Sequence, residues 1–400
     1  MSYFLLPYIK QNIDIENIEC TYSDEEDFNA TISKSLKYYL NNIKHQIGKC
    51  PQQWDIYKKY TNPYEHVHTN LPGTTQAISK LKPISRSFYK MIEICNILQI
   101  TDGIYGNINS FHLAEGPGGF IEALIYLRDN EADNYYGMTL IDNDVNKNIP
   151  GWRKSKYLLE NHDNITIENG SDGTGNLFNK ENFLYCHKKY KGSINIITAD
   201  GGFDFSVDFN KQEVMSHNLI FSEICYAIAM QKKGGSFILK VYDIFTQGTI
   251  DLLYILSNFY TKVYIFKPNT SRYANSERYI ICKNFTLNDT TNFVKQVLPF
   301  FDNINKTEEE GMKYVKRFLN VKIPYIYINK LEEYNAILGQ QQIENLSLTL
   351  NFIKNNKMDK LELVRKHNIV KCNYWCQKYR IPYNKCNQQT NIFLLNKELY

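Results

Sequence analysis

The chain has 400 residues, of which 43% are hydrophobic, and its formal net charge at pH 7 is +4. This apolar content is enough for a full hydrophobic core, so general disorder is excluded. The length predicts one large domain with substantial additions, or two domains. The net charge is too small to require a polyanionic partner, although a local basic groove is compatible with it.

The cysteines and the N-terminus indicate the cellular setting. Nine cysteines are scattered without a paired framework, which predicts reduced thiols inside a cell. Cys372, Cys376 and Cys386 are the closest group, but their spacing matches no common zinc signature, and no metal is expected. The apolar run before Pro7 is too short for a signal peptide, and no stretch is long enough to cross a bilayer. We therefore expect a soluble intracellular protein without a membrane partner.

The predicted elements follow one another in three segments. Residues 1–75 form an N-terminal extension with a helical pattern at 27–47, and a second helix is expected within 76–100. From there strands and helices alternate. Strands are expected at 111–114, 136–141, 194–199, 236–241, 262–266 and 278–283, and helices at 120–127, 212–233 and 248–260.

This alternation predicts a mostly parallel sheet with helices on both faces. Residues 194–199 are almost continuously apolar, as expected for a strand that is buried on both faces. Residues 301–400 have mainly helical patterns and contain no chemical motif. We therefore expect an α/β domain at 76–300, preceded by the extension 1–75 and followed by a mainly helical region, 301–400.

The segment Phe111-His-Leu-Ala-Glu-Gly-Pro-Gly-Gly-Phe120 carries the main functional signal. An apolar strand ends in an acidic residue, and a glycine-rich turn leads into a helix, which is how such sheets present a nucleoside cofactor. The glycines allow close approach of the backbone to a ligand. Pro117 removes a backbone donor that a pyrophosphate loop would use. The turn therefore predicts a nucleoside cofactor without a phosphate tail, such as S-adenosylmethionine.

Three ionisable residues are expected at the same edge of the sheet. Asp200 follows one strand, Lys240 lies near the end of the next, and Glu277 precedes the last. If that last strand is antiparallel, its start meets the ends of the others, where open α/β sheets bind ligands. Lys90 lies on the helix before the first strand. A salt bridge or a solvent-reaching lysine would explain each residue alone, but three at one edge beside a nucleoside turn indicate a catalytic site.

At these residues the chain resembles the FtsJ-like ribose 2′-O-methyltransferases, and most of all their messenger-RNA cap branch, which includes relatives in large DNA viruses. The resemblance covers about residues 80–285. Its blocks are Glu115-Gly-Pro-Gly-Gly-Phe120, Gly137-Met-Thr-Leu140, Asp172-Gly-Thr-Gly-Asn-Leu177, Ala199-Asp-Gly-Gly-Phe203, Gly234-Gly-Ser-Phe-Ile-Leu-Lys240, Lys267-Pro-Asn-Thr-Ser-Arg272 and Asn275-Ser-Glu-Arg-Tyr279.

The resemblance implies a Rossmann-like methyltransferase fold with a mostly parallel seven-stranded sheet, and it implies roles for individual residues. The family's catalytic tetrad falls on Lys90, Asp200, Lys240 and Glu277, with Lys90 matched only through Arg86-Ser-Phe-Tyr-Lys-Met91. Asn210 and Asn275 are the implied substrate-binding residues. Asp144 is an alternative to Asp142 for holding the cofactor ribose. The implied cofactor-binding residues are Ala114, Glu115, Gly116, Pro117, Gly118, Gly119, Phe120, Asp142, Asp172 and Asn176.

The charges of the tetrad suggest a mechanism. A ribose 2′-hydroxyl attacks the methyl group of S-adenosylmethionine only once its proton is removed. Lys240 can take that proton only when neutral, and we expect Lys90 and the sulfonium charge to lower its pKa. Asp200 opposes this effect, so we expect it to orient Lys240 and the methyl group, while Glu277 pairs with Lys90. This chemistry needs no metal.

The expected function is therefore methylation of the ribose 2′-hydroxyl of the first transcribed nucleotide of capped messenger RNA. Two alternatives stay open: ribose methylation of ribosomal or transfer RNA by the same site, and a catalytically idle RNA-binding subunit. Capped messenger RNA is the expected partner, with other capping or transcription proteins as possible further partners. The composition and the viral relatives suggest a large DNA virus, with a protist as the alternative; a viral protein would lie in a cytoplasmic virus factory or in the virion.

Overall fold

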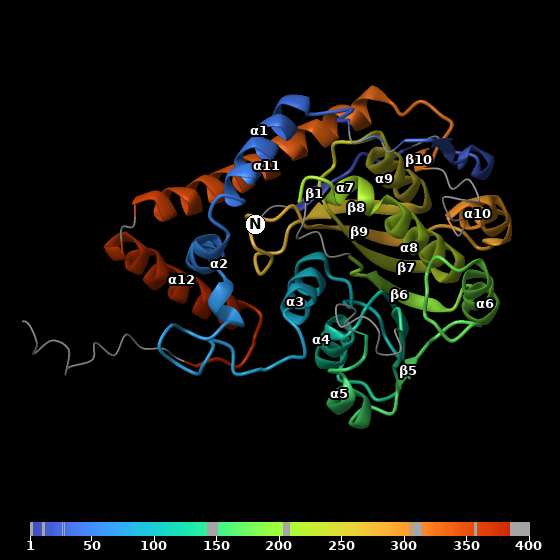
Figure 1. The fold of residues 1–400 in the computed structure, drawn as a ribbon. Coiled ribbons are helices and arrows are strands. Elements are labelled where there is room, and N and C mark those ends of the chain that lie inside the picture. The colour runs from blue at the N-terminus through green and yellow to red at the C-terminus, as the bar shows by residue number, and fades with distance from the viewer. Residues whose placement is uncertain are drawn as a thin grey trace, which may run out of the picture.

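The computed structural model describes residues 3–9, 13–25, 27, 29–141, 151–202, 209–304, 306, 314–355 and 358–384 (Figure 1). Within these residues an eight-stranded sheet has the order β1-β8-β9-β7-β6-β3-β4-β5, and β10 pairs with β2 in a small second sheet. The strands are β1 (Tyr3–Leu5), β2 (Thr21–Ser23), β3 (Asn109–Leu113), β4 (Asn134–Met138), β5 (Ile165–Ile167), β6 (Ile194–Ala199), β7 (Gln231–Val241), β8 (Tyr260–Phe266), β9 (Arg278–Phe285) and β10 (Tyr314–Arg317).

The helices cover the sheet and build the flanking regions. The α-helices are α1 (Lys34–Ile47), α2 (Pro51–Thr61), α3 (Ser87–Leu98), α4 (Gly119–Arg128), α5 (Lys156–Glu160), α6 (Lys180–Tyr190), α7 (Gln212–Met215), α8 (His217–Met230), α9 (Gln247–Phe259), α10 (Thr291–Ile304), α11 (Tyr325–Asn355) and α12 (Met358–Lys378). Two short 3-10 helices, η1 (Ile15–Asn17) and η2 (Glu65–Val67), lie in the N-terminal region. None of the helices in the described residues combines the length and the apolar character needed to cross a bilayer.

The strand directions place the predicted site residues at one edge. Strands β5, β4, β3, β6 and β7 are parallel, and β9 runs antiparallel between β7 and β8. The start of β9 therefore lies at the carboxyl ends of the parallel strands. This is the antiparallel arrangement that was predicted to bring Glu277 to the same edge as Asp200 and Lys240. Lys240 and Tyr279 are register partners across β7 and β9.

The sheet is buried on both faces because side chains alternate along each strand. In β7, Phe237 and Leu239 belong to the core cluster formed with α8, α9 and α10, whereas Ile238 faces the cluster formed with α3 and α4. Ile196 and Ile197 on β6 divide in the same way. All five side chains are buried, so both faces are covered at the centre of the sheet, as the predicted α/β architecture demands.

The two flanking regions pack against each other as well as against the central domain. Figure 1 shows α11 and α12 extending beyond the sheet, with α1 and α2 beside them. Helix α12 also contacts η2, and its Trp375 packs edge-on against Tyr89 of α3 at 5.7 Å between ring centroids. The mainly helical C-terminal region is confirmed, while the division at residues 75 and 300 stays a prediction.

Some predicted boundaries were wrong for local reasons. The sheet has eight strands rather than seven, because Tyr3–Leu5 adds a strand too short to show a pattern. The predicted helix at 76–100 begins only at Ser87, since Pro83 lies just before it and proline is disfavoured inside a helix. The predicted helix at 212–233 breaks at Ser216 and gives way to β7 at Gln231.

Candidate active site

The glycine turn joins β3 to α4 through backbone that is left-handed at two positions. Ala114 has a φ of 51° and Gly118 a φ of 104°, both in the left-handed region. A Cβ on Gly116 would lie 2.5 Å from the carbonyl oxygen of Gly151. A Cβ on Gly119 would lie 2.1 Å from the hydroxyl of Ser87, so the start of α4 lies directly against α3. The turn is therefore a tight backbone cradle at the carboxyl end of β3.

Glu115 is a buried carboxyl group within this turn. Its Oε1 accepts a 2.6 Å hydrogen bond from the backbone N–H of Phe120, while Oε2 is buried with no hydrogen-bond partner among the described residues. Burial, reinforced by the negative charge of Asp200, raises the pKa of Glu115 well above its usual value. A buried carboxyl with a free acceptor, set in a glycine cradle, fits a ligand that brings hydrogen-bond donors or positive charge.

The loop after β5 lies beside the end of β4. The backbone N–H of Ile141 donates to the carbonyl oxygen of Thr174 at 2.8 Å, and a Cβ on Gly175 would lie 2.1 Å from the carbonyl oxygen of Thr139. This contact leaves room only for glycine at position 175. The loop thus adjoins the carboxyl end of β4, where the family resemblance predicts contacts with the cofactor.

Asp172 and Asn176 shape this loop by bonding to it. Asp172 accepts hydrogen bonds from Thr174 N–H at 2.9 Å and from the side-chain amides of Asn179 at 2.7 Å and Asn182 at 2.9 Å. Asn176 accepts one from the N–H of Phe178 at 3.0 Å. Their part in holding a cofactor stays a prediction. Asp142 and Asp144, the candidates for the ribose contact, lie outside the described residues.

The four predicted tetrad residues are brought together at the carboxyl edge of the sheet. Lys90 Nζ donates to Glu277 Oε2 at 2.8 Å, and Lys240 Nζ donates to the carbonyl oxygen of Asp200 at 2.6 Å. The distance from Lys240 Nζ to Asp200 Oδ1 is 3.3 Å. The tetrad therefore forms two lysine–carboxylate pairs from residues that are far apart in the sequence.

Tyr279 joins the two pairs, and the sequence reasoning missed it. Its buried hydroxyl donates to Asp200 Oδ1 at 2.7 Å and accepts from Lys90 Nζ at 3.2 Å. Two signals could have found it: Tyr279 lies two residues after Glu277, on the same side of the extended chain, and opposite Lys240 in the antiparallel pair. The site is thus a continuous network from Glu277 to Lys240.

The charges around Lys240 set its pKa in the protein alone. Burial alone would lower the pKa of Lys240, but the negative charge of Asp200, with smaller contributions from Tyr242 and Glu277, raises it. We expected Lys90 and the sulfonium charge of the cofactor together to lower this pKa and Asp200 to oppose them; in the protein alone the effect of Asp200 prevails. The pKa of Glu277 is lowered, because Lys90, Lys240 and Lys267 outweigh its burial.

Lys267 holds the loop that carries Asn275 and Glu277. Its buried Nζ donates to the carbonyl oxygen of Asn275 at 2.7 Å, to Asn275 Oδ1 at 2.6 Å and to the carbonyl oxygen of Glu277 at 2.7 Å. Ser271 adds a 2.7 Å hydrogen bond to Glu277 Oε1. Buried Glu93 of α3 accepts the N–H groups of residues 269 and 270. The loop is therefore fixed from both sides.

The two predicted substrate residues lie on adjacent segments. Asn275 is exposed in this loop, and Asn210 lies in the turn before α7. A 2.9 Å hydrogen bond from Ser276 Oγ to Gln212 Oε1 joins the two segments next to these positions. Their contact with a substrate stays a prediction. No group of three or more metal-ligating side chains occurs in the part of the chain that the structure describes.

A mostly parallel sheet with a glycine cradle and a lysine–carboxylate network at its carboxyl edge defines an α/β methyltransferase. Residues 83–285, just over half of the chain, match the FtsJ-like methyltransferase family, and the chain belongs to that family. This match confirms the predicted family and fold class. S-adenosylmethionine is the cofactor of the family, which confirms the predicted cofactor, and the cradle around Glu115 fits it.

Two curated relatives are cap-specific messenger-RNA (nucleoside-2′-O-)-methyltransferases. Enzyme 2 of Pongo abelii is 26% identical over 90% of this chain and 46% of its own length, and enzyme 1 of Mus musculus is 31% identical over 80% and 39%. The chain thus spans less than half the length of these relatives. A solved structure described as a putative ribosomal RNA methyltransferase from Plasmodium falciparum is 23% identical, covering 50% of this chain and 97% of its own, with a TM-score of 0.36.

Proposed function

We propose that the protein is an S-adenosylmethionine-dependent methyltransferase that acts on the ribose 2′-hydroxyl of the first transcribed nucleotide of capped messenger RNA. The observation that carries this proposal is the network from Lys240 through Asp200 and Tyr279 to Lys90 and Glu277, at the same edge as the glycine cradle. The likeness to cap-specific relatives supports the substrate class.

In this proposal each side chain has a distinct task. S-adenosylmethionine supplies an electrophilic methyl group when bound at the cradle. Lys240 accepts the proton of the ribose hydroxyl, and because Asp200 raises its pKa in the protein alone, this role requires the positive charge of the cofactor beside it. Asp200 orients Lys240, and Glu277 holds Lys90 in place. Alignment of the hydroxyl with the methyl group supplies much of the rate.

A cavity next to Asn275 supports a capped substrate. Its volume is about 260 Å³, and its lining combines the aromatic side chains of Trp54 and Phe209 with polar groups that include Gln212 and Arg272. RNA bases outside a helix are bound by stacking on aromatic side chains and by hydrogen bonds to their edges. The cavity therefore suits a nucleobase held near the methylated ribose, and we assign it to the cap guanine.

The alternatives make different predictions. A ribosomal or transfer RNA enzyme would use the same network on uncapped RNA, and an idle RNA-binding subunit would bind RNA without transferring methyl groups. Methyl transfer should be measured on one RNA sequence prepared with and without a 7-methylguanosine cap. The proposal predicts transfer to the capped RNA alone; equal transfer to both would contradict cap specificity, and no binding of S-adenosylmethionine would favour the idle subunit.

The remaining partners and the location are also proposals. A messenger-RNA cap methyltransferase works beside capping or transcription proteins, and it needs an intracellular setting where reduced cysteines persist. Eight cysteines in the described residues are free thiols, among them buried Cys372 and Cys376, while Cys386 lies outside those residues. Co-purification of tagged protein with RNA polymerase or capping enzymes would test the partner proposal. A viral origin, with a virus factory or virion location, stays a prediction.

A further inference from the structure

A second cavity is lined in part by Arg86 and is separate from the cavity at Trp54 and Asn275. Its volume is about 690 Å³, and it shares no lining residue with the cavity at Trp54 and Asn275. Residues 75–86 and the first turn of α3 form much of its wall. Lys80, Lys82 and Arg86 contribute positive charge, and none of the described residues that line it is acidic. The cavity is therefore suited to an anion.

Arg86 lines this cavity with a side chain that is held in place by a hydrogen bond. Its Nη2 donates to the carbonyl oxygen of Thr270 at 2.9 Å, but its Nε is buried and has no hydrogen-bond partner in the described part of the chain. The nearby carboxylates are already engaged: Glu65 binds Arg272 at 2.6 Å, and Glu277 binds Lys90 at 2.8 Å. A guanidinium that keeps a buried donor unpaired favours a ligand oxygen at that position.

The position of Arg86 relates the cavity to the catalytic network. Arg86 directly precedes α3 with helical dihedral angles, and Lys90 lies four residues later, so the two side chains lie on the same side of the helix. Through Thr270, Arg86 also contacts the loop that carries Glu277. Ser87 next to it packs on the cradle at Gly119. An anion at Arg86 would therefore lie beside the reacting ribose.

The two lysines continue this positive charge along the cavity. Lys80 and Lys82 are exposed, and neither has an ion-pair partner among the residues that the structure describes. Three cationic side chains that line one cavity near the catalytic network suit the phosphates of a nucleic-acid strand, which arginine and lysine side chains bind without reading sequence.

We propose that this cavity binds the phosphodiester groups on the 3′ side of the methylated nucleotide. Arg86 holds the phosphate next to the reacting ribose, and Lys80 and Lys82 hold those that follow. The inference rests on the proposed RNA substrate, but it does not depend on the cap. It assigns the 3′ part of the RNA to one side of the active site and the cap to the other.

The test compares RNA length with salt dependence. Binding of a fluorescently labelled capped dinucleotide and a capped hexanucleotide to the full chain is measured by anisotropy over a range of salt concentrations. For single-stranded nucleic acid, the slope of log affinity against log salt concentration becomes shallower by about 0.7 for each phosphate contact that is removed. We expect both Arg86→Gln and the double variant Lys80→Gln/Lys82→Gln to flatten the slope for the hexanucleotide. The double variant should leave the slope for the dinucleotide almost unchanged.

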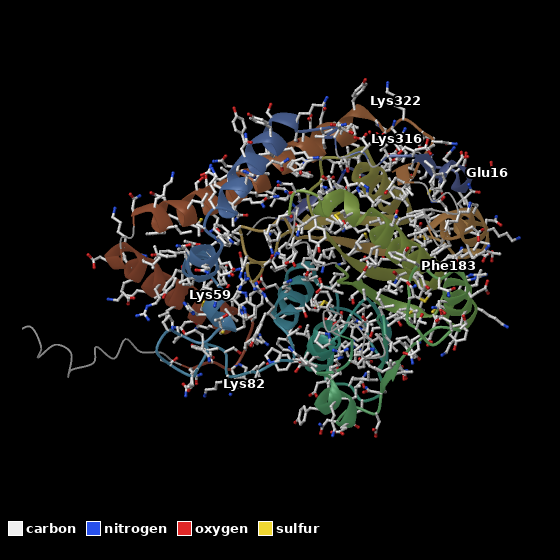
Figure 2. All side chains as sticks on the ribbon, viewed as in Figure 1. Glu16, Lys59, Lys82, Phe183, Lys316 and Lys322 are labelled. Atoms are coloured by element: carbon white, nitrogen blue, oxygen red, sulfur yellow. The ribbon has the colours of Figure 1, made fainter. Side chains whose placement is uncertain are left out.

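The control is Lys316→Gln, an exposed lysine on β10, which Figure 2 shows on the opposite side of the view from Lys82. It should leave both slopes unchanged, and Arg86→Lys should restore part of the slope that Arg86→Gln loses. If Arg86→Gln does not fold, the double variant at the exposed lysines still decides. Unchanged hexanucleotide slopes in the double variant would overturn the proposal, and so would equal losses for both RNAs, because they would place the lysines elsewhere on the substrate path.

An uncapped hexanucleotide separates this inference from the proposed function. If its slope falls in the same variants while methyl transfer proves independent of the cap, the phosphate site stands and the cap proposal fails. If capped RNA alone is methylated but the slopes do not change, the function stands and the phosphate site is overturned. Binding of an acidic peptide that the variants abolish, without any effect on RNA, would assign the cavity to a protein partner instead.

Discussion

The hydroxyl of Tyr279 lies between Lys90 and Asp200, 3.2 Å from the amine and 2.7 Å from the carboxylate. It joins two ion pairs that would otherwise be separate, and it does so from a fully buried position on β9. The hydroxyl therefore connects the two ends of the network by hydrogen bonds.

Tyr279→Phe should lower kcat by on the order of tenfold to a hundredfold, because misplaced catalytic groups slow a reaction that depends on alignment. The loss of stability should be about 1–2 kcal/mol, since one buried hydrogen-bonding group is removed. Tyr260→Phe is the matched control: it removes another buried hydroxyl, bonded to Gln231 at 2.9 Å outside the site. Equal effects of the two variants on kcat would contradict the network.

Lys267, which holds the loop of Asn275, should make the stability of the protein depend on pH. Burial lowers the pKa of Lys267 to about 7, against an ordinary value of 10.5. Between these values the unfolded chain binds more protons at this residue than the folded chain, so this residue makes stability rise with pH. Lys267→Met should remove that rise in denaturant titrations and should lower kcat.

The control for Lys267 is Lys283→Met. Lys283 also donates to backbone carbonyl oxygens, those of Leu98 at 2.7 Å and Gln99 at 3.2 Å, but it lies away from the tetrad. The Lys283→Met variant should lower the free energy of unfolding without changing kcat. A Lys267→Met enzyme with normal turnover would show that the loop keeps its position without this amine.

Glu65 should account for part of the acid sensitivity of the fold. Burial opposes its charge, but its hydrogen bonds and ion pair with Arg272 lower the pKa of Glu65 to about 2 from 4.5. Its stabilising contribution is therefore complete above pH 4.5 and is lost as the pH falls toward 2. Glu65→Gln should destabilise the protein by about 3–5 kcal/mol at pH 7, as expected when one partner of a buried pair is removed.

The same variant should have a smaller loss of stability between pH 4.5 and 2 than the parent chain. Asp55→Asn is a suitable control, because Asp55 pairs with Lys58 at the surface and its removal should cost little. Parallel acid-unfolding curves for Glu65→Gln and the parent would show that the Glu65–Arg272 pair does not contribute.

Gly116→Ala should abolish binding of S-adenosylmethionine. Its new Cβ would approach the carbonyl oxygen of Gly151 to 2.5 Å, and backbone cannot yield as a flexible side chain can. Such overpacking costs about 1–3 kcal/mol of stability. Calorimetric titration with the cofactor checks the first effect. Gly48→Ala, at an exposed helix end with its nearest neighbour at 3.5 Å, should bind normally; unchanged binding by Gly116→Ala would show that the cradle is not the cofactor site.

Much of the site could be predicted from the sequence, because a polar residue at the end of an apolar run marks the end of a buried strand. Asp200 and Lys240 end apolar runs, and an antiparallel β9 was enough to bring Glu277 to them. Tyr279 could not be singled out among 31 tyrosines, since its importance comes from the register with Lys240. Neither could Lys267 or Arg86, whose roles depend on loop contacts that no local pattern specifies. The short strands β1 and β5 were missed because three residues carry no periodicity.

In the proposed reaction, Lys240 and its network promote transfer of a methyl group from S-adenosylmethionine to one ribose of capped RNA. The most direct measurement incubates capped RNA with S-adenosylmethionine and either the parent chain or Lys240→Ala, then identifies methylated nucleosides by nuclease digestion and mass spectrometry. We predict a 2′-O-methyl group on the first transcribed nucleotide with the parent chain, and none with Lys240→Ala, although that variant still binds the RNA. Methylation at that ribose by Lys240→Ala at the parent rate would contradict the account.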